Sequence, residues 1–340
     1  MRVLITGING FAGSHLSDHI LANVPDVQLF GIDYNNDFSR ISHIQDKINF
    51  RMVDICNEQA VRKTVKEICP DRIFHLAALI AVDKSFQFPQ EFFKVNVLGT
   101  LYLLDAVRDF NPGCSLLVAG SSEEYGYVRE DEVPIREYNS LRPMSPYAVS
   151  KVAAEKLVEQ YVRSYKLHAT TTRAFNHFGP RQRDEAAIAN WVYQLEAISH
   201  DKTQEAVLQV GSLEAKRDLT DVRDIVRAYW MISERLRDTN DVGELIFNIA
   251  TNKTKTMQEW LDLVFAGYEK FCARHKRSYR NIMVQPDPKR MRPSDVPILQ
   301  GDYSKIRGFL GWEPQISPEQ TIDDMFEWVA EHSKPLCITK

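Results

Sequence analysis

The chain has 340 residues, of which 44% are hydrophobic, and a formal net charge of −4; this length allows one large α/β domain with a smaller one, and the weakly acidic balance argues against general nucleic-acid binding. No apolar stretch approaches the ~20 residues that cross a bilayer, and strand-like residues follow the first two residues without the apolar segment of a secretory signal. The five cysteines lack the spacing of a disulfide framework or zinc site, so we expect a cytoplasmic protein with reduced thiols, no metal and no nucleic-acid or membrane partner.

Short apolar runs alternate with longer amphipathic segments over the first two thirds of the chain. The expected strands cover residues 2–6, 27–32, 48–53, 72–76, 115–119 and 168–173. The expected helices lie near residues 11–23, 58–68, 90–110 and 146–165. This alternation is typical of repeated βα units, so we predict an α/β fold with a parallel sheet.

The pattern loosens after residue 175. Predicted helices near residues 186–199, 222–236 and 256–275 alternate with loops rich in charge, proline and glycine. We interpret residues 1–175 as the first domain, to which parts of 211–250 return. Residues 176–340 are then a smaller, mixed C-terminal lobe that binds the substrate and is partly interleaved with the first domain.

A glycine-rich segment follows the first expected strand and opens the first expected helix. Gly7, Gly10 and Gly13 are spaced so that one glycine permits a tight turn, another lets the backbone approach a pyrophosphate, and the third lets helix and strand pack closely. The pyrophosphate would bind at the helix N-terminus, beside Phe11 and Ala12. The segment therefore predicts a Rossmann-type, doubly wound sheet with a dinucleotide site.

Asp33 ends the second expected strand, roughly 20 residues after the last glycine of the loop. A carboxylate at this place can accept hydrogen bonds from the adenosine ribose and repels a 2′-phosphate, so we expect NAD(H) to be favoured. Arg40 could reach a 2′-phosphate if the loop folds back, which leaves NADP(H) possible. The alternative is that Asp33 is a simple turn residue.

Tyr147 and Lys151 lie four residues apart on the expected helix 146–165. Residues at this spacing share one face, so the phenol and the ammonium point into one site. An ordinary tyrosine has a pKa of ~10, too high for ready proton exchange at neutral pH. We expect the neighbouring cation to lower the pKa of Tyr147.

The order of these motifs resembles the extended short-chain dehydrogenase family. The resemblance rests on the glycine loop and on Asp54-Ile55, His75-Leu-Ala-Ala78, Asn96-Val-Leu-Gly99-Thr100 and Tyr147-Ala-Val-Ser-Lys151. It implies that the following residues contact the cofactor: Asp54, Ile55, Leu76, Ala77, Ala78, Asn96, Tyr147 and Lys151. A capping or packing role is the alternative for several of them, and for His75 we favour a hydrogen-bonded place in the core.

The family places its catalytic serine or threonine four residues before a Tyr-Gly pair, which selects Ser121 here. Its segment follows the fifth strand, at the carboxyl end of the sheet where such folds bind ligands. The resemblance implies that Ser121 polarises the reacting sugar oxygen and that Tyr147 exchanges its proton. Glu123 stands where the family's sugar 4,6-dehydratases carry a proton-abstracting base, so it is also a catalytic candidate. The simplest interpretation of Glu124 is a solvated carboxylate.

Segments 174–181, 210–224 and 290–296 are candidates for the substrate site. Arginine suits phosphate because its planar guanidinium donates two parallel hydrogen bonds and stays charged. Arg217 and Arg292 are candidates to clamp a nucleotide-sugar pyrophosphate, with Asn176 nearer the sugar, and surface charge is the alternative. The remaining expected substrate contacts are Ser122, Arg181 and Val210.

Over about residues 1–330, these motifs are similar to the branch of the family that reduces or dehydrates GDP-linked hexoses. The resemblance is greatest to GDP-4-keto-6-deoxy-D-mannose reductases, with the GDP-mannose 4,6-dehydratases as the sister group. It implies NAD(P)H-dependent reduction of the C4 ketone of a GDP-4-keto-6-deoxy sugar. Dehydration, C4 epimerisation and non-catalytic dinucleotide sensing are the alternatives. The family also implies a homodimer, formed through the helices near 90–110 and 146–165.

Overall fold

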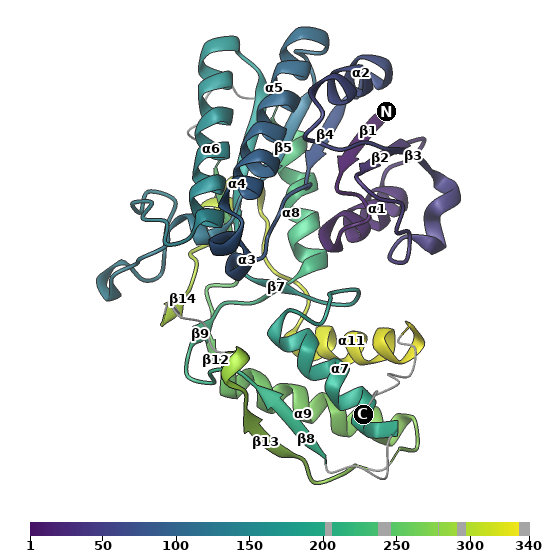
Figure 1. The fold of residues 1–340 in the computed structure, drawn as a ribbon, viewed down its shortest axis with the longest axis vertical. Coiled ribbons are helices and arrows are strands. Elements are labelled where there is room, and N and C mark those ends of the chain that lie inside the picture. The colour runs from purple at the N-terminus through teal and green to yellow at the C-terminus, as the bar shows by residue number, and fades with distance from the viewer. Residues whose placement is uncertain (201–205, 237–245, 278, 291–296, 333–340) are drawn as a thin grey trace.

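A computed structural model describes residues 1–200, 206–236, 246–277, 279–290 and 297–332 (Figure 1). Its main sheet has seven parallel strands in the order β11-β6-β5-β4-β1-β2-β3. The strands are β1 (Arg2–Thr6), β2 (Gln28–Asp33), β3 (Ile48–Met52), β4 (Arg72–His75), β5 (Ser115–Ala119), β6 (His168–Ala174) and β11 (Phe247–Ile249). This order reverses between β1 and β4, which confirms the predicted Rossmann-type, doubly wound sheet.

Helices cover both faces of this sheet. On one face lie α1 (Phe11–Asn23) and α8 (Val222–Arg235), and on the other α2 (Glu58–Ile68), α5 (Gly99–Phe110) and α6 (Pro146–Tyr165). The strands are apolar on both faces for this reason: Val3 and Ile5 belong to the first core, whereas Leu4 between them belongs to the second. Helix α6 begins at Pro146, and the Ser145 side chain accepts a hydrogen bond from Ala148 N.

The single helix expected near 90–110 is interrupted. It consists of α4 (Pro89–Phe92), a π-helical turn η2 (Phe93–Leu98) and α5, and a short helix α3 (Val82–Gln87) precedes it. Helix α5 begins at Gly99, where an added Cβ would lie 3.0 Å from the Ile55 side chain. Single π turns are frequent at functional sites, and this one carries Asn96.

The C-terminal lobe has its own core. Helices α7 (Ala187–His200), α9 (Met257–Arg274) and α11 (Pro318–His332) pack together beside the parallel pair β8 (Val207–Val210) and β13 (Met283–Pro286) (Figure 1). The smaller pairings are mixed: β9 (Lys216–Arg217) runs antiparallel to β12 (Lys255–Thr256) and parallel to β14 (Ile298–Leu299). Strand β7 (His177–Phe178) pairs in parallel with β10 (Thr220–Asp221). Helix α10 (Ser304–Leu310) packs against β11 of the main sheet, so the chain returns to the first domain more than once.

Two expectations about the whole chain can be compared with the described residues. Within these ranges no helix combines the length and apolar character that crossing a bilayer demands. No disulfide joins the cysteines of the described residues, and Cys337 lies outside them.

Candidate active site

The glycine loop connects β1 to α1 at the point where the strand order reverses. Gly7 has a φ of +72°, and a Cβ there would lie 2.8 Å from Ala77 N. A Cβ on Gly13 would lie 2.3 Å from Gly7 O. No side chain caps the start of α1 at Gly10, so the first amides of this helix can bind an anion. The close approach of these backbones forms a cradle that suits a pyrophosphate.

Asp33 ends β2 beside this loop and is 8% exposed. Its Oδ2 accepts a hydrogen bond from Asn9 N at 3.2 Å, and burial raises the pKa of its carboxyl. The loop after β2 does fold back, because Arg40 Nη1 donates to Asn9 O at 3.5 Å. The Asp33 carboxylate and the Arg40 guanidinium therefore both hydrogen-bond the backbone of Asn9.

The loop after β4 forms another wall of this region. Leu76, Ala77 and Ala78 are partly buried, and Ala77 N donates to Thr6 Oγ1 at 3.2 Å. Asn96 holds the loop in place: its Oδ1 accepts from Leu79 N at 2.9 Å and its Nδ2 donates to Leu79 O at 3.0 Å. The same Nδ2 donates to Ser150 Oγ at 2.9 Å, so Asn96 joins this loop to α6.

The neighbouring family motifs have local partners. Asp54 is exposed, and its Oδ1 accepts from Cys56 N at 2.9 Å. Ile55 is buried against Gly99. His75 is buried between Thr6 Oγ1, at 2.7 Å from Nδ1, and Thr100 Oγ1, at 3.1 Å from Nε2. Burial lowers the pKa of His75 to about 3, so this histidine is a neutral, hydrogen-bonded core residue, as we expected.

Ser121, Tyr147 and Lys151 meet at the carboxyl end of β5. Ser121 caps η3 (Ser122–Glu124), a turn of 3-10 helix, and its Oγ accepts from Glu123 N at 3.2 Å. The Tyr147 phenol hydrogen-bonds the Ser121 hydroxyl. One turn further along α6, Lys151 Nζ donates to Ala119 O at 2.7 Å. Ser121 comes from the turn after β5, whereas Tyr147 and Lys151 come from α6. The structure thus brings together three side chains that the sequence analysis selected from two distant segments.

The electrostatics of this group correct one expectation. Burial raises the pKa of Tyr147, with Glu123 adding to the rise and the Ser121 hydrogen bond opposing it. We expected Lys151 to lower this pKa, but the loss of the phenol's contact with water dominates and raises it. Burial also lowers the pKa of Lys151 to about 8. The site therefore holds a protonated phenol beside an ammonium that titrates near physiological pH.

The substrate candidates are scattered. Asn176 is exposed directly after β6, close to the end of the strand that neighbours β5. Arg217 lies on β9 in the C-terminal lobe. Val210 ends β8 with its side chain fully buried in the core of that lobe, so it cannot offer its side chain to a ligand. Ser122 is buried under the turn that it begins, and Arg292 lies outside the described residues.

Arg181 contacts α1 and the loop after β2. Its Nη2 is 2.6 Å from Asp18 Oδ2 on α1, and its carbonyl oxygen accepts from Arg40 Nε at 2.8 Å. Arg181 therefore belongs to the side of the molecule that carries the glycine loop. The sequence predicts a substrate contact for Arg181, and this role stays a prediction.

The sequence interpretation missed how the segment around Asn176 joins the glycine loop. His177 stacks on Phe11, with ring centroids 5.9 Å apart and an interplanar angle of 10°. His15 Nε2 lies 2.8 Å from Pro180 O, and burial lowers the pKa of His15 to about 4. The Phe-Asn-His-Phe-Gly-Pro motif was the available signal, and the structure shows that it packs on the start of α1.

A family model described as GDP-mannose 4,6 dehydratase matches residues 4–325. The GDP-6-deoxy-D-mannose reductase of Pseudomonas aeruginosa is 28% identical, and the similarity covers 94% of this chain and 94% of that protein. The GDP-mannose 4,6-dehydratase of Yersinia enterocolitica is 31% identical, with 100% of this chain and 96% of that protein covered.

Solved structures show the same architecture over the same length. The structure of RMD from Pseudomonas aeruginosa complexed with NADPH has a TM-score of 0.81 and 25% identity, covering 98% of this chain and 99% of that one. The UDP-glucose 4-epimerase of Thermus thermophilus in complex with NAD has a TM-score of 0.77 and 28% identity, covering 96% and 98%.

Proposed function

The chain belongs to the GDP-mannose 4,6 dehydratase family, and we propose that it reduces the C4 ketone of a GDP-4-keto-6-deoxy sugar with NAD(P)H. Family membership confirms the resemblance to nucleotide-sugar enzymes that the motifs predicted. The observation that favours reduction over dehydration is the protonated state of the Tyr147 phenol. Its buried phenol hydrogen-bonds Ser121, and burial raises its pKa. A phenol held protonated is ready to donate, which reduction of a ketone requires.

The residues present fit a nicotinamide dinucleotide. The cradle of Gly7 and Gly13 would hold the pyrophosphate, and Asp33 would accept hydrogen bonds from the adenosine ribose. When bound, the nicotinamide ring supplies the hydride for C4. Lys151 would hold the nicotinamide ribose with the N–H groups that it does not donate to Ala119.

The protein's own part in the reaction is proton delivery and orientation. Ser121 Oγ–H donates to the ketone oxygen and positions it beside the phenol of Tyr147. Tyr147 gives its proton to the alkoxide that forms at C4, and Lys151 stabilises the phenolate that results. Positioned proton transfer of this kind contributes ~10²–10⁴-fold to a rate.

For the substrate we assign the sugar end to Asn176, which is exposed after β6. Ser122, which is buried in the turn after β5, stays a prediction from the sequence. Arg217 and Arg292 are our candidates for the pyrophosphate of a GDP sugar, because guanidinium groups bind phosphate through paired hydrogen bonds. The relatives whose names specify GDP sugars support this choice.

Dehydration of GDP-mannose is the second candidate, and Glu123 favours it. Glu123 follows Ser121 by two residues, is partly buried, and its charge acts on Tyr147. A carboxylate in this place is suited to remove the proton next to a C4 ketone, which elimination of water requires. The same Tyr147 would then have to accept a proton first, and its raised pKa opposes an ionised phenol at rest.

Two incubations separate these functions. In the first, the protein receives GDP-4-keto-6-deoxy-D-mannose with NADH or NADPH. In the second, it receives GDP-mannose without added reductant. A reductase consumes reduced nicotinamide only in the first and yields a GDP-6-deoxyhexose. A 4-keto product from GDP-mannose in the second incubation would assign the dehydratase function instead.

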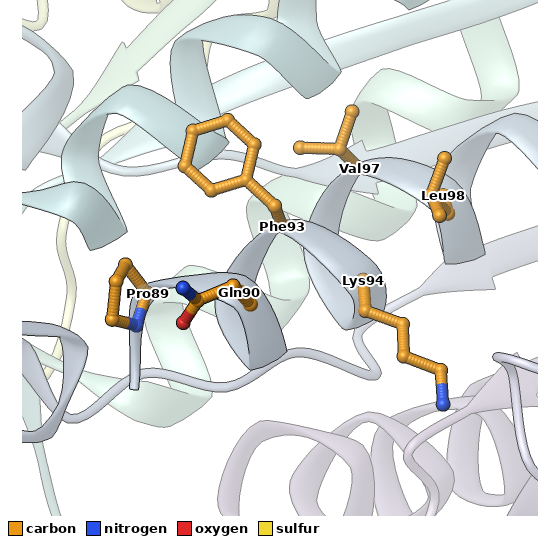
Figure 2. Close-up of a pocket in the computed structure, with 6 residues that line it drawn as sticks. All are labelled: Pro89, Gln90, Phe93, Lys94, Val97 and Leu98. Atoms are coloured by element: carbon orange, nitrogen blue, oxygen red, sulfur yellow. The ribbon is translucent and has the colours of Figure 1, made fainter. Parts of the chain in front are cut away.

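We also propose a homodimer through the face formed by η2 and the start of α6. Figure 2 shows a shallow pocket on this face, lined by Pro89, Gln90, Phe93, Lys94, Val97 and Leu98. Phe93 also lines a second hollow together with Met144 and Val149. All three of these apolar side chains are exposed. Contiguous exposed apolar surface marks an interaction site, and two-fold symmetric dimers are the commonest oligomers. Phe92 of the same segment contacts Tyr147 edge-to-face, so the proposed interface lies close to the active site.

A further inference from the structure

A fully buried carboxyl group lies directly behind the catalytic serine. Glu124, which we expected to be solvated, has no exposed surface. Its Oε1 accepts a hydrogen bond from Ser121 N at 2.7 Å, within the capping box of η3. The preceding Gly120 makes room for it, because a Cβ there would lie 2.6 Å from Glu124 Oε1. The position of the Ser121 backbone therefore depends on this side chain.

The positive charge nearest to Glu124 is already engaged by another carboxylate. Arg173 on β6 donates from Nε to Glu155 Oε2 at 2.8 Å and from Nη2 to Glu155 Oε1 at 2.7 Å. Its Nη1 donates to Tyr125 Oη at 3.0 Å. Glu124 Oε2 is 3.6 Å from Arg173 Nε, beyond an ordinary hydrogen bond. Such bidentate pairing identifies Glu155 as the ionised partner of Arg173.

The second oxygen of Glu124 lacks a donor of its own. Within the part of the chain that the structure describes, no N–H or O–H group donates to Glu124 Oε2, although this atom is buried. Lys151 Nζ donates to Ala119 O, and within the described residues it makes no hydrogen bond to Glu124 Oε2. The Glu124 carboxyl instead lies in hydrogen-bonding contact with that of Glu155. Two buried carboxyl groups can hydrogen-bond only when a proton lies between them.

We propose that Glu124 is a positioning residue that is kept protonated: its Oε2–H donates to Glu155 while Oε1 holds the Ser121 amide. The proposal depends on the proposed function only in giving Ser121 a part in the reaction. The directions of the pKa shifts agree with it. Burial, followed by the Glu155 charge, raises the pKa of Glu124 well above its usual range. Burial alone would raise the pKa of Glu155, but the hydrogen bonds and charge of Arg173 hold it below the usual range.

The charged and titratable groups around Glu124 and its immediate neighbours come from several elements. They are Tyr147, Lys151 and Glu155 on α6, Arg173 on β6, Glu123 and Tyr125 in or beside η3, Glu137 in the loop before α6, and Tyr229 on α8. A proton on Glu124 leaves the Lys151 cation without an adjacent carboxylate. An ionised Glu124 would raise the pKa of Tyr147 further and oppose the phenolate that forms when Tyr147 gives up its proton.

Two substitutions of similar size test this proposal. Glu124→Gln keeps an acceptor for the Ser121 amide and a donor for Glu155, so it imitates the protonated acid. Glu124→Leu keeps the volume but removes both hydrogen bonds. We expect Glu124→Gln to retain a kcat close to that of the wild type. Glu124→Leu should lose on the order of 10²-fold in kcat, because a small displacement of a catalytic group has an effect of this size. The KM for the nicotinamide cofactor should stay unchanged in both.

The protonation state itself is read without any substrate. The infrared difference spectrum between the wild type and Glu124→Gln at neutral pH should show the C=O stretching band of a protonated carboxyl. A band of an ionised carboxylate in its place would overturn the proposal, and so would Glu124→Gln losing as much kcat as Glu124→Leu while both melt near the wild-type temperature. If the wild type does not reduce the keto sugar at all, the proposed function fails, and the spectrum decides the state of Glu124 separately.

Discussion

Lys151 Nζ donates a hydrogen bond to Ala119 O at 2.7 Å and thereby ties α6 to the carboxyl end of β5. The ammonium is buried in this position, and burial lowers its pKa to about 8. In the proposed reaction Lys151 stabilises the Tyr147 phenolate, so the charge state of Lys151 should control the rate.

We expect kcat for ketone reduction to fall as the pH rises above about 8. Lys151 carries its charge below this pKa and loses it above, so the rate should drop by up to about tenfold per pH unit on the alkaline side. The measurement is a pH–rate profile at saturating substrate. The matched variant is Lys151→Arg, which should be slower throughout but lack this alkaline decline. A wild-type profile that stays flat to pH 10 would contradict the assignment.

Tyr147→Phe should fold normally and lose ~10²–10⁴-fold in kcat, because the ring still packs against Phe92 but cannot donate a proton. Steady-state rates and a thermal melt measure the two effects. The control is Tyr125→Phe, which removes another buried hydroxyl. This hydroxyl donates a hydrogen bond to Asn248 and accepts one from Arg173. This control should reduce stability more than catalysis. A Tyr147→Phe enzyme with more than about a tenth of the wild-type rate would exclude the role in proton transfer.

Glu123→Gln separates the two candidate reactions. In a reductase, this variant should still reduce the keto sugar, since no proton is removed from carbon. In a dehydratase, it should abolish turnover of GDP-mannose while hydride transfer to a ketone survives. Product analysis by mass spectrometry distinguishes the cases. Loss of ketone reduction in a folded Glu123→Gln protein would show that Glu123 takes part in the reduction itself.

Asp33→Ser should weaken NADH binding and improve NADPH binding relative to it. The carboxylate that would accept from the ribose hydroxyls and repel a 2′-phosphate is then gone. A like-charge contact in such a partly buried groove corresponds to about 5- to 150-fold in relative affinity. Arg40→Ala is the complementary variant and should weaken the binding of NADPH alone. The Arg40 guanidinium hydrogen-bonds the backbone of Asn9, as the Asp33 carboxylate does. Fluorescence titration of both cofactors measures these constants. Binding of NADPH by the wild type at least as tight as that of NADH would reverse the expected preference.

Phe93→Glu should convert the proposed dimer into a monomer, because it places a charge in the apolar face of η2 and α6. Light scattering at micromolar concentration measures the mass. Met283→Glu, at another exposed apolar position on β13 in the C-terminal lobe, is the control and should leave the mass unchanged. A wild-type monomer at this concentration would refute the dimer.

The features that the sequence predicted are those with local signatures. The glycine loop, Asp33 at the end of β2 and the spacing of Tyr147 and Lys151 can all be interpreted from residues close in the chain. The main sheet could be predicted because its strands are apolar runs that are buried on both faces. Strand β11 escaped prediction because it has three residues, too few for a periodic pattern.

The features that escaped prediction depend on distant partners. Glu124 is buried beside Arg173 of β6 and Glu155 of α6, which are distant in the chain. Arg181 turns towards Asp18 on α1, which nothing near residue 181 indicates. The raised pKa of Tyr147 reflects the loss of contact with water, and burial at one position cannot be read from the spacing of Tyr147 and Lys151.

The proposed reaction transfers hydride from a reduced nicotinamide to C4 of a GDP-linked keto sugar. The most direct measurement uses NADH or NADPH carrying deuterium at the transferred position of the nicotinamide, with GDP-4-keto-6-deoxy-D-mannose as substrate. This reaction yields a GDP-6-deoxyhexose that has gained one deuterium, located at C4 by NMR, and Tyr147→Phe should form this product at least about 100-fold more slowly. A product without deuterium at C4, or a 4-keto sugar formed from GDP-mannose without any added reductant, would contradict it.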